Sequence, residues 1–305
     1  KTIQKECYKH SFFIALFFFS PHHMEIQTIF REKTMPKTIL ITGATDGIGL
    51  ATSKKLVSLG HHLLLHGRNL EKLEHVREEL SDLTNTLSIE TYVADLSHME
   101  DIEQLAKAIS DKHTTLDVLI NNAGVYKSPT STTQEGLDIR FAVNTIAPYL
   151  LTKRLLPLLN ASGRIINLSS AAQSPVDLKA LSGHTQLSDR EAYAQSKLAI
   201  TMWSRHMADS IKGNGPAIIA VNPGSLLGSK MVKEAFGIKG GDINIGAEIL
   251  IRAALSEEFA SASGHYFDND SGKFAAPYPD ALDPKRCEEV VMTIKDILEK
   301  MLRRN

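Results

Sequence analysis

The sequence has few cysteines, almost no net charge and no long apolar run. Its 305 residues include only two cysteines, Cys7 and Cys287, which exclude a disulfide framework and a cysteine-rich metal site. The formal net charge of -1 gives no general attraction to nucleic acid or to an anionic membrane. No stretch of the sequence approaches the ~20 apolar residues of a stable membrane span. Hydrophobic residues make up 43% of the chain, enough for a sizeable core.

The first 34 residues differ from the rest of the chain. An apolar run over residues 12–19 follows basic residues, as in the core of a signal peptide, but no clear small-residue cleavage site comes after it. We interpret residues 1–34 as a disordered or non-native extension and Met35 as the natural start. A weak membrane or export signal is the alternative. The preferred interpretation predicts a cytoplasmic protein, and recovery from a membrane or periplasmic fraction would contradict it.

Apolar strands and helical segments alternate after residue 36, with no linker, repeat or low-complexity tract between them. This alternation predicts a single α/β domain over residues 35–305, with a doubly wound, mostly parallel sheet covered by helices on both faces. Ligands of such sheets bind where the strands end. The predicted strands cover residues 39–41, 61–68, 89–93, 116–120, 164–168, 217–221 and 264–267. The predicted helices follow Gly49, span residues 70–80, 99–113, 137–159 and 247–254, carry Tyr193 and Lys197, and begin near Pro284.

Three glycines follow directly after the first predicted strand. Gly43, Gly47 and Gly49 let the backbone come close to a phosphate, and the next helix begins with free N–H groups and the positive end of its dipole. Their G-x-x-x-G-x-G spacing differs from the best-known dinucleotide fingerprint. Taken alone, the glycines are also consistent with an ordinary tight turn.

The ends of the second and third predicted strands bear on the choice of cofactor. Enzymes that use NAD commonly have an acidic residue about 20 residues after the glycines, where it binds the ribose 2′-hydroxyl. This sequence has Arg68 there instead, and its guanidinium suits a 2′-phosphate. We therefore predict NADP(H) as the preferred cofactor and NAD(H) as the alternative, against the interpretation that Arg68 only caps or solvates the loop. Asp95 is expected either to accept a hydrogen bond from adenine or to cap the next helix.

Several short motifs occur together in one order along the chain. Over about residues 37–275 they resemble those of the short-chain dehydrogenase/reductase family, and the overall texture is similar to its retinol-dehydrogenase-like and carbonyl-reductase-like members. The resemblance implies a Rossmann-type fold with a sheet of seven strands in the order 3-2-1-4-5-6-7. The motifs are Thr42-Gly43-x-x-x-Gly47-Ile48-Gly49, Asn121-Asn122-Ala123-Gly124, Ser170, Tyr193-x-x-x-Lys197 and Pro223-Gly224.

The resemblance also implies roles for single positions. The catalytic group would be Ser170 (rather than its neighbour Ser169), Tyr193 and Lys197, joined through water by Asn144. The family often has a threonine shortly after Pro-Gly to hold the cofactor's carboxamide. This sequence has none there, so Ser229 or a backbone group would replace it. The implied cofactor-binding residues are Gly43, Thr45, Asp46, Gly47, Ile48, Gly49, Arg68, Asp95, Leu96, Asn121, Ala123, Tyr193, Lys197, Pro223 and Gly224.

Tyr193 and Lys197 fit the chemistry of hydride transfer. The cofactor carries the hydride, and the protein must supply a proton and hold the carbonyl. Four residues apart on a helix, the two side chains share a face, where the Lys197 ammonium would lower the tyrosine pKa and could also bond the nicotinamide ribose. Ser170 would donate to the substrate oxygen, and Tyr193 would act as general acid or base. Asn144 is unfavourable in mid-helix, which suits a water-relay role.

Two apolar segments, residues 171–190 and 224–245, are the predicted walls of the substrate pocket. They favour a small apolar aldehyde, ketone or alcohol as substrate, and the resemblance adds a homodimer or homotetramer. No metal site is expected, because the His61-His62 pair has no third ligand at metal spacing. One alternative is an epimerase or dehydratase of the wider superfamily, which would usually have a larger C-terminal segment. The other is a redox sensor that binds NADP(H) without turnover, which would not need a proton donor.

Overall fold

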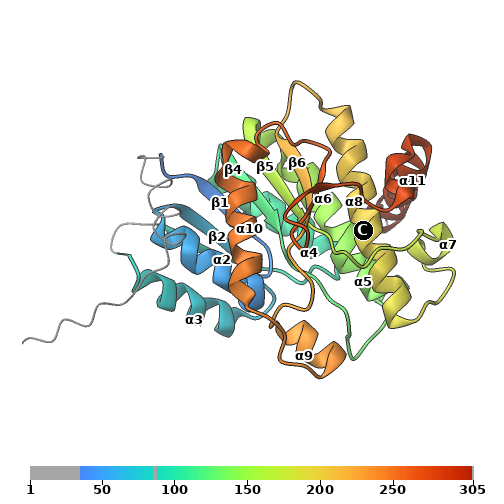
Figure 1. Ribbon diagram of the computed structural model, residues 1–305, viewed down its shortest axis with the longest axis horizontal. Helices are drawn as coiled ribbons and strands as arrows, with labels where there is room; N and C mark the ends of the chain where they lie inside the picture. Colours follow the sequence, from blue (N-terminus) through green and yellow to red (C-terminus); the bar gives the residue numbers. More distant parts are fainter. Residues whose placement is uncertain (1–34, 85–87, 304–305) are drawn as a thin grey trace, which may run out of the picture. The chain divides into compact units, whose positions relative to one another are not determined.

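An eight-stranded sheet runs through the part of the chain that begins at Lys37 (Figure 1). The computed structural model describes residues 35–84 and 88–303, so the predicted extension over residues 1–34 lies outside the described residues. The strand order is β3-β2-β1-β4-β5-β6-β7-β8, and all neighbours are parallel except β7 and β8. The predicted order 3-2-1-4-5-6-7 is therefore confirmed, and one antiparallel strand extends it. The strands are β1 Thr38–Ile41, β2 His62–Gly67, β3 Ile89–Val93, β4 Leu116–Asn121, β5 Leu159–Leu168, β6 Ala217–Asn222, β7 Tyr266–Asp268 and β8 Lys273–Ala275.

Helices cover both faces of this sheet, as the alternating pattern predicts (Figure 1). Buried side chains of α2, α3 and α10 form one hydrophobic cluster with the sheet, and those of α4, α6, α8 and α11 form the other. Among the described residues, no helix is both long enough and apolar enough to cross a bilayer. The helices are α2 Gly47–Ser58, α3 Leu70–Ser81, α4 Met99–Lys112, α5 Ile139–Phe141, α6 Ala147–Leu155, α7 Leu178–Leu181, α8 Asp189–Ser210, α9 Lys230–Phe236, α10 Ile243–Leu255 and α11 Pro284–Leu302.

The central strands read as continuous apolar runs because they are buried on both faces. In β1, Ile39 and Ile41 join the cluster of α2, α3 and α10, whereas Leu40 between them joins the opposite cluster. All three side chains are 0% exposed. Successive side chains of a strand point to opposite faces, so a strand covered on both sides needs apolar residues at every position.

The segment predicted as one helix over residues 137–159 shows the main local difference between prediction and structure, because it is interrupted. A wide π-helical turn, Ala142–Ile146, joins α5 to α6, and the last part, Leu156–Leu158, is a tight 3-10 turn. Pro148 has no N–H group and cannot give the Asn144 carbonyl its ordinary α-helical bond, so the wide turn falls where the regular pattern would fail. Strand β5 begins at Leu159, earlier than predicted, because this end pairs with Leu116 of β4.

Candidate active site

The glycine turn between β1 and α2 has no room for side chains. Gly43 (φ +67°) and Gly47 (φ +55°) adopt the left-handed conformation that favours glycine. A Cβ atom on Gly49 would lie 2.2 Å from the Gly43 carbonyl oxygen. Asp46 caps α2 by accepting a 2.7 Å hydrogen bond from the Gly47 N–H. The turn thus brings bare backbone and the N-terminus of a 12-residue helix together, an arrangement suited to a phosphate.

The second asparagine of the Asn-Asn-Ala-Gly segment holds this turn in place. Asn122 Nδ2 donates to the carbonyl oxygens of Thr42 (2.8 Å) and Gly43 (3.0 Å). The Ala123 N–H donates to Thr42 Oγ1 at 3.1 Å. The loop after β4 and the turn after β1 are therefore one hydrogen-bonded unit, and the sequence reasoning missed Asn122 as its main link.

Asn121 points away from that unit. Its side chain is 3% exposed, and Nδ2 donates to Asn167 Oδ1 (2.8 Å) and Thr152 Oγ1 (3.1 Å) in the core. Its Oδ1 is buried and has no hydrogen-bond partner among the described residues. The predicted contact of Asn121 with the cofactor ribose is therefore not available to its side-chain amide in this arrangement.

The ends of β2 and β3 bring the predicted adenosine-binding residues together. Arg68 is exposed after β2 and forms no hydrogen bond or ion pair with another described residue, although its charge acts on Asp95. Burial raises the pKa of Asp95, but hydrogen bonds from Ser97 and the nearby positive charges outweigh it and leave the pKa below its usual value. The alternative that Asp95 caps the next helix is wrong, since His98 is the N-cap of α4. Leu96, beside Asp95, is 6% exposed.

Two adjacent serines at the end of β5 have different surroundings. Ser169 is 3% exposed, and its hydroxyl donates to the Lys197 carbonyl (3.0 Å) and bonds Thr201 Oγ1 (2.7 Å). Ser170 is half-buried, its hydroxyl accepts a hydrogen bond from the Ala172 N–H (3.1 Å), and this hydroxyl is near enough to Tyr193 to lower the tyrosine pKa. The geometry thus brings Ser170, the serine that the sequence favours, to the tyrosine and leaves Ser169 in the packing of α8.

Tyr193 and Lys197 lie near the start of α8, which begins with a capping box between Ser188 and Glu191. Lys197 is 4% exposed, and its Nζ donates to the Leu168 carbonyl (2.7 Å) and lies 5.6 Å from the centre of the Tyr193 ring. Burial lowers the pKa of Lys197 to about 8. Burial also raises the pKa of Tyr193, by more than the nearby Ser170 hydroxyl lowers it. The expected lowering of the tyrosine pKa by Lys197 is therefore not found in this arrangement.

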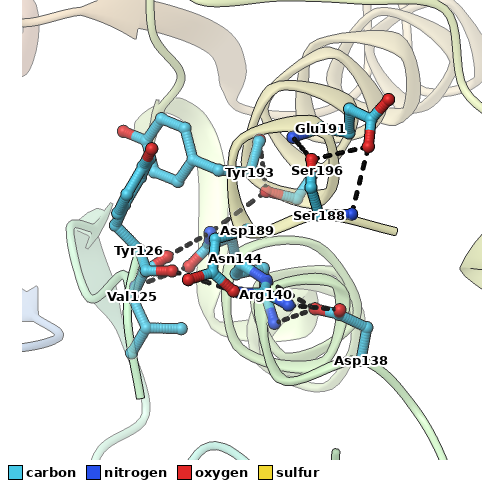
Figure 2. Close-up of polar contacts among 10 residues, drawn as sticks. All are labelled: Val125, Tyr126, Asp138, Arg140, Asn144, Ser188, Asp189, Glu191, Tyr193 and Ser196. Carbon is cyan, nitrogen blue, oxygen red and sulfur yellow. Dashed lines mark hydrogen bonds and ion pairs between the residues drawn. The ribbon is translucent and has the colours of Figure 1, made fainter. Parts of the chain in front are cut away.

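Asn144 ties the loop after β4 to α8, as Figure 2 shows. Its Oδ1 accepts from the Val125 N–H (2.8 Å), and its Nδ2 donates to the Val125 carbonyl (2.9 Å) and to Ser196 Oγ (3.0 Å). Ser196 precedes Lys197, and its hydroxyl also donates to the Tyr193 carbonyl at 2.7 Å. Both side-chain amide atoms of Asn144 are thus engaged in a clamp, and Pro148 cannot give its main-chain carbonyl the ordinary α-helical bond.

The segment after β6 is fixed by a carboxylate. Pro223 and Gly224 lead to Ser225, whose N–H (2.8 Å) and hydroxyl (2.6 Å) both donate to Asp270. Ser229 is the N-cap of α9 and accepts from the Val232 N–H at 3.3 Å. Both serines near the position of the absent threonine are therefore engaged in local structure.

The sequence matches known proteins over most of its length. The family model described as short chain dehydrogenase matches residues 37–237. The chain belongs to the short-chain dehydrogenase family. It is 33% identical to human retinol dehydrogenase 13 over 272 residues, which cover 83% of this chain and 82% of that protein. It is 32% identical to human polyprenol dehydrogenase over 256 residues, covering 77% of each chain. A short chain dehydrogenase from Shigella flexneri 2a complexed with NADP is 26% identical, with a TM-score of 0.61, covering 77% of this chain and 97% of that one.

Membership makes this protein a nicotinamide-dependent oxidoreductase acting on CH–OH groups. The residues fit such a cofactor on observations of their own. A Cβ on Gly43 would lie 2.9 Å from Ala123 Cα, one on Gly49 2.2 Å from the Gly43 carbonyl oxygen, and one on Gly67, at the end of β2, 2.8 Å from Thr45 Cγ2, so the turn packs this closely only with glycines. Arg68, next to Gly67, is exposed, and its charge acts on Asp95 at the end of the neighbouring strand β3. These features suit a dinucleotide with phosphates at the turn.

Several residues of this short-chain dehydrogenase site carried no signal in the sequence reasoning. The Tyr266 hydroxyl (3.2 Å) and Gln173 Nε2 (2.9 Å) both donate to the Ser170 carbonyl and so hold the serine loop. Tyr126, in the loop after β4, packs its ring against that of Tyr193, and Arg140 of α5 donates to the Tyr126 carbonyl. Only their positions in space reveal them, because none of them belongs to a short motif.

Proposed function

We propose that the protein is an NADP(H)-dependent oxidoreductase that interconverts an apolar aldehyde or ketone and its alcohol. The observation that carries this proposal is the position of Lys197 Nζ, 5.6 Å from the centre of the Tyr193 ring, with the Ser170 hydroxyl near enough to act on the tyrosine pKa. This group adjoins the loop that holds the glycine turn: a Cβ on Gly124 would lie 3.6 Å from Lys197 Nζ. A proton donor beside a phosphate-binding turn is what carbonyl reduction with a dinucleotide requires.

The chain's own residues hold the substrate oxygen and move the proton. A bound nicotinamide supplies the hydride in reduction and accepts it in oxidation. Ser170 donates a hydrogen bond to the carbonyl oxygen, where negative charge develops. Because burial raises the pKa of Tyr193, its phenol keeps its proton at neutral pH and serves as general acid for the same oxygen. In the reverse direction the Tyr193 phenol first gives up its own proton, for which Asn144 and a water molecule would form the relay, and the resulting phenolate oxygen then takes the alcohol proton.

The preference for NADP(H) rests on Arg68. Its guanidinium is exposed, is not paired with a described carboxylate and lies at the end of β2, where an NAD-specific enzyme has an acidic side chain. A guanidinium fork binds a phosphate through paired, charge-assisted hydrogen bonds. The structural relative from Shigella flexneri is complexed with NADP, which supports the same choice.

The apolar substrate is supported by the segment after β6. Leu226, Phe236 and Ile238 are large apolar side chains that are 49%, 55% and 42% exposed, and the Phe236 ring packs on Tyr126, which in turn packs on Tyr193. The relatives named for retinol and polyprenol are named for apolar alcohols. An apolar alcohol or carbonyl compound therefore suits this chain, without restriction to either of those two.

The test follows nicotinamide absorbance with NADPH or NADH and a panel of apolar aldehydes and ketones. We expect NADPH to be consumed faster than NADH, Tyr193→Phe to lose turnover while it still binds NADPH, and Arg68→Ala to shift the NADPH-to-NADH ratio of kcat/KM toward NADH. Binding of NADPH without oxidation across the whole panel would instead favour a sensor. An unchanged ratio in Arg68→Ala would contradict the role of Arg68 alone.

A further inference from the structure

Three aromatic rings from three segments form a row beside the proposed proton donor. Tyr193 of α8 meets Tyr126, in the loop after β4, edge to face, with ring centres 5.0 Å apart and planes at 61°. Tyr126 in turn meets Phe236 at the end of α9, with ring centres 5.8 Å apart. Tyr193 and Tyr126 are half-buried and Phe236 is 55% exposed. This aromatic row therefore extends from the catalytic group to the exposed apolar segment.

The backbone next to Tyr126 is held from two sides (Figure 2). Asn144 bonds both main-chain groups of Val125, and Arg140 Nη1 donates to the Tyr126 carbonyl at 3.4 Å. The ring itself packs against Tyr193 on one side and Phe236 on the other, so backbone and ring are both restrained. The Tyr126 ring is thus held as a fixed surface, unlike Phe236, whose helix α9 has only seven residues and no buried residue.

Arg140 makes this hold rigid because its own charge is buried and paired. The residue is 1% exposed, and its guanidinium donates to Asp138 through Nε (2.8 Å) and Nη2 (2.6 Å). Nη1 also pairs with Asp189, in the first turn of α8. Although burial alone would lower the pKa of Arg140, the two carboxylates hold it above its usual value. A buried guanidinium in three such contacts cannot leave them without leaving charges unpaired.

We propose that Tyr126 is a substrate-specificity residue, whose ring forms a fixed apolar wall for the substrate's chain, and that Arg140 is the positioning residue that holds it. The proposal rests on the proposed function. A carbonyl oxygen that is bonded to the hydroxyls of Ser170 and Tyr193 brings its carbon substituents next to the tyrosine. Tyr126 is the aromatic ring that packs against Tyr193 from outside α8, so an apolar substituent of sufficient length contacts it.

The test compares NADPH-dependent kcat/KM for a long aldehyde, octanal, with that for a short one, propanal. In Tyr126→Ala the preference for octanal falls about tenfold, since a pocket discriminates apolar groups by about 10–200-fold through contacts of this size. Most of the loss is an increase in KM for octanal. Tyr126→Phe, which keeps the ring, retains the preference, whereas Tyr126→Leu, which keeps bulk without the ring face, loses part of it.

Arg140→Lys tests whether Arg140 positions Tyr126. One ammonium cannot reproduce the planar fork that serves Asp138, Asp189 and the Tyr126 carbonyl, so the octanal preference falls in the same direction as in Tyr126→Ala, but less. NADPH binding by all four variants, measured by fluorescence titration, stays within about twofold of the original, because a positioning role at Tyr126 does not involve the cofactor. Met292→Ala, at a position of α11 that is 48% exposed, is the remote control.

The outcomes separate this inference from the proposed function. If the unaltered protein reduces neither octanal nor propanal nor any carbonyl of the panel, the proposed function fails and this inference with it. If it reduces both and Tyr126→Ala leaves their ratio unchanged, the proposed function stands and Tyr126 is not a specificity residue. A ratio that falls equally in Tyr126→Phe would assign the effect to the hydroxyl, and an unchanged ratio in Arg140→Lys would remove Arg140 from the proposal.

Discussion

Lys197 should make the free energy of unfolding of this protein rise with pH between about pH 7 and pH 10. Its ammonium is 4% exposed, and burial lowers its pKa to about 8 from an ordinary value of about 10.4. Between these two values the unfolded chain binds the proton more tightly than the folded protein does, so the free energy of unfolding rises with pH. The full difference corresponds to about 3 kcal/mol, of which about 2 kcal/mol is gained between pH 7 and pH 9.5.

Lys197→Met removes this titrating group while it keeps a side chain of similar length. The test measures the free energy of unfolding of the cofactor-free proteins in urea at pH 7 and at pH 9.5. Between these two pH values it should rise by about 2 kcal/mol more in the unaltered protein than in the variant. The comparison between the two proteins cancels the contributions of all other titrating groups. Lys285→Met, at an exposed position, is the matched control and should keep the original pH dependence. Equal pH dependence in Lys197→Met and in the unaltered protein would refute the argument that burial disfavours the Lys197 charge.

Three further predictions concern the glycine turn, the two adjacent serines and the thiol of Cys287. Gly49→Ala should lower the free energy of unfolding by about 2–3 kcal/mol and weaken NADPH binding, because the new Cβ would lie 2.2 Å from a backbone oxygen. Gly213→Ala, at a position with open space around it, should cost only about 1 kcal/mol and leave NADPH affinity unchanged. Urea unfolding and NADPH titration check both variants. Ser170→Ala should lower kcat by at least about 100-fold with little loss of stability. Ser169→Ala should leave kcat nearly unchanged and lower the free energy of unfolding by about 1 kcal/mol. Steady-state kinetics and urea unfolding check both variants. Cys287 is 2% exposed and burial raises its pKa to about 11, so iodoacetamide at pH 7.5 should leave it unmodified in the folded protein. Peptide mass spectrometry that locates alkylation on Cys287, as distinct from Cys7, would contradict this.

The fold could be predicted from the sequence because its signals are local and repeated. Each buried strand is a short apolar run, and each run ends in a turn residue or a polar motif, so the alternation is visible without any contact being known. The strand order came from the family resemblance. Strand β8 was missed because three residues, Lys273–Ala275, pair antiparallel with β7 and carry no periodic pattern of their own. The wide turn at residues 142–146 was missed because the apolar pattern continues through it.

The residues around the tyrosine were harder to predict because the contacts that matter join distant parts of the chain. Arg140 and Asp189 are 49 positions apart, and each looks in the sequence like a solvated charge on a helix. Only the packing of α5 against α8 turns Arg140 into a buried guanidinium that pairs with a helix start and holds the Tyr126 carbonyl. One of the two hydrogen bonds that hold the Ser170 carbonyl comes likewise from Tyr266, 96 positions away.

The two adjacent asparagines show why a motif does not by itself assign a role to each of its residues. Asn121 is the last residue of β4 and stands opposite Asn167 of β5, so the register of the parallel pair sends its amide into the core beside that residue. Asn122 lies beyond the strand end, where alternation no longer applies and its amide can turn to the glycine turn. If β4 were shifted by one residue against β5, Asn122 would point into the core and Asn121 would point away from it. The motif therefore marks the end of β4, and the sheet register decides which asparagine bonds the core and which bonds the glycine turn.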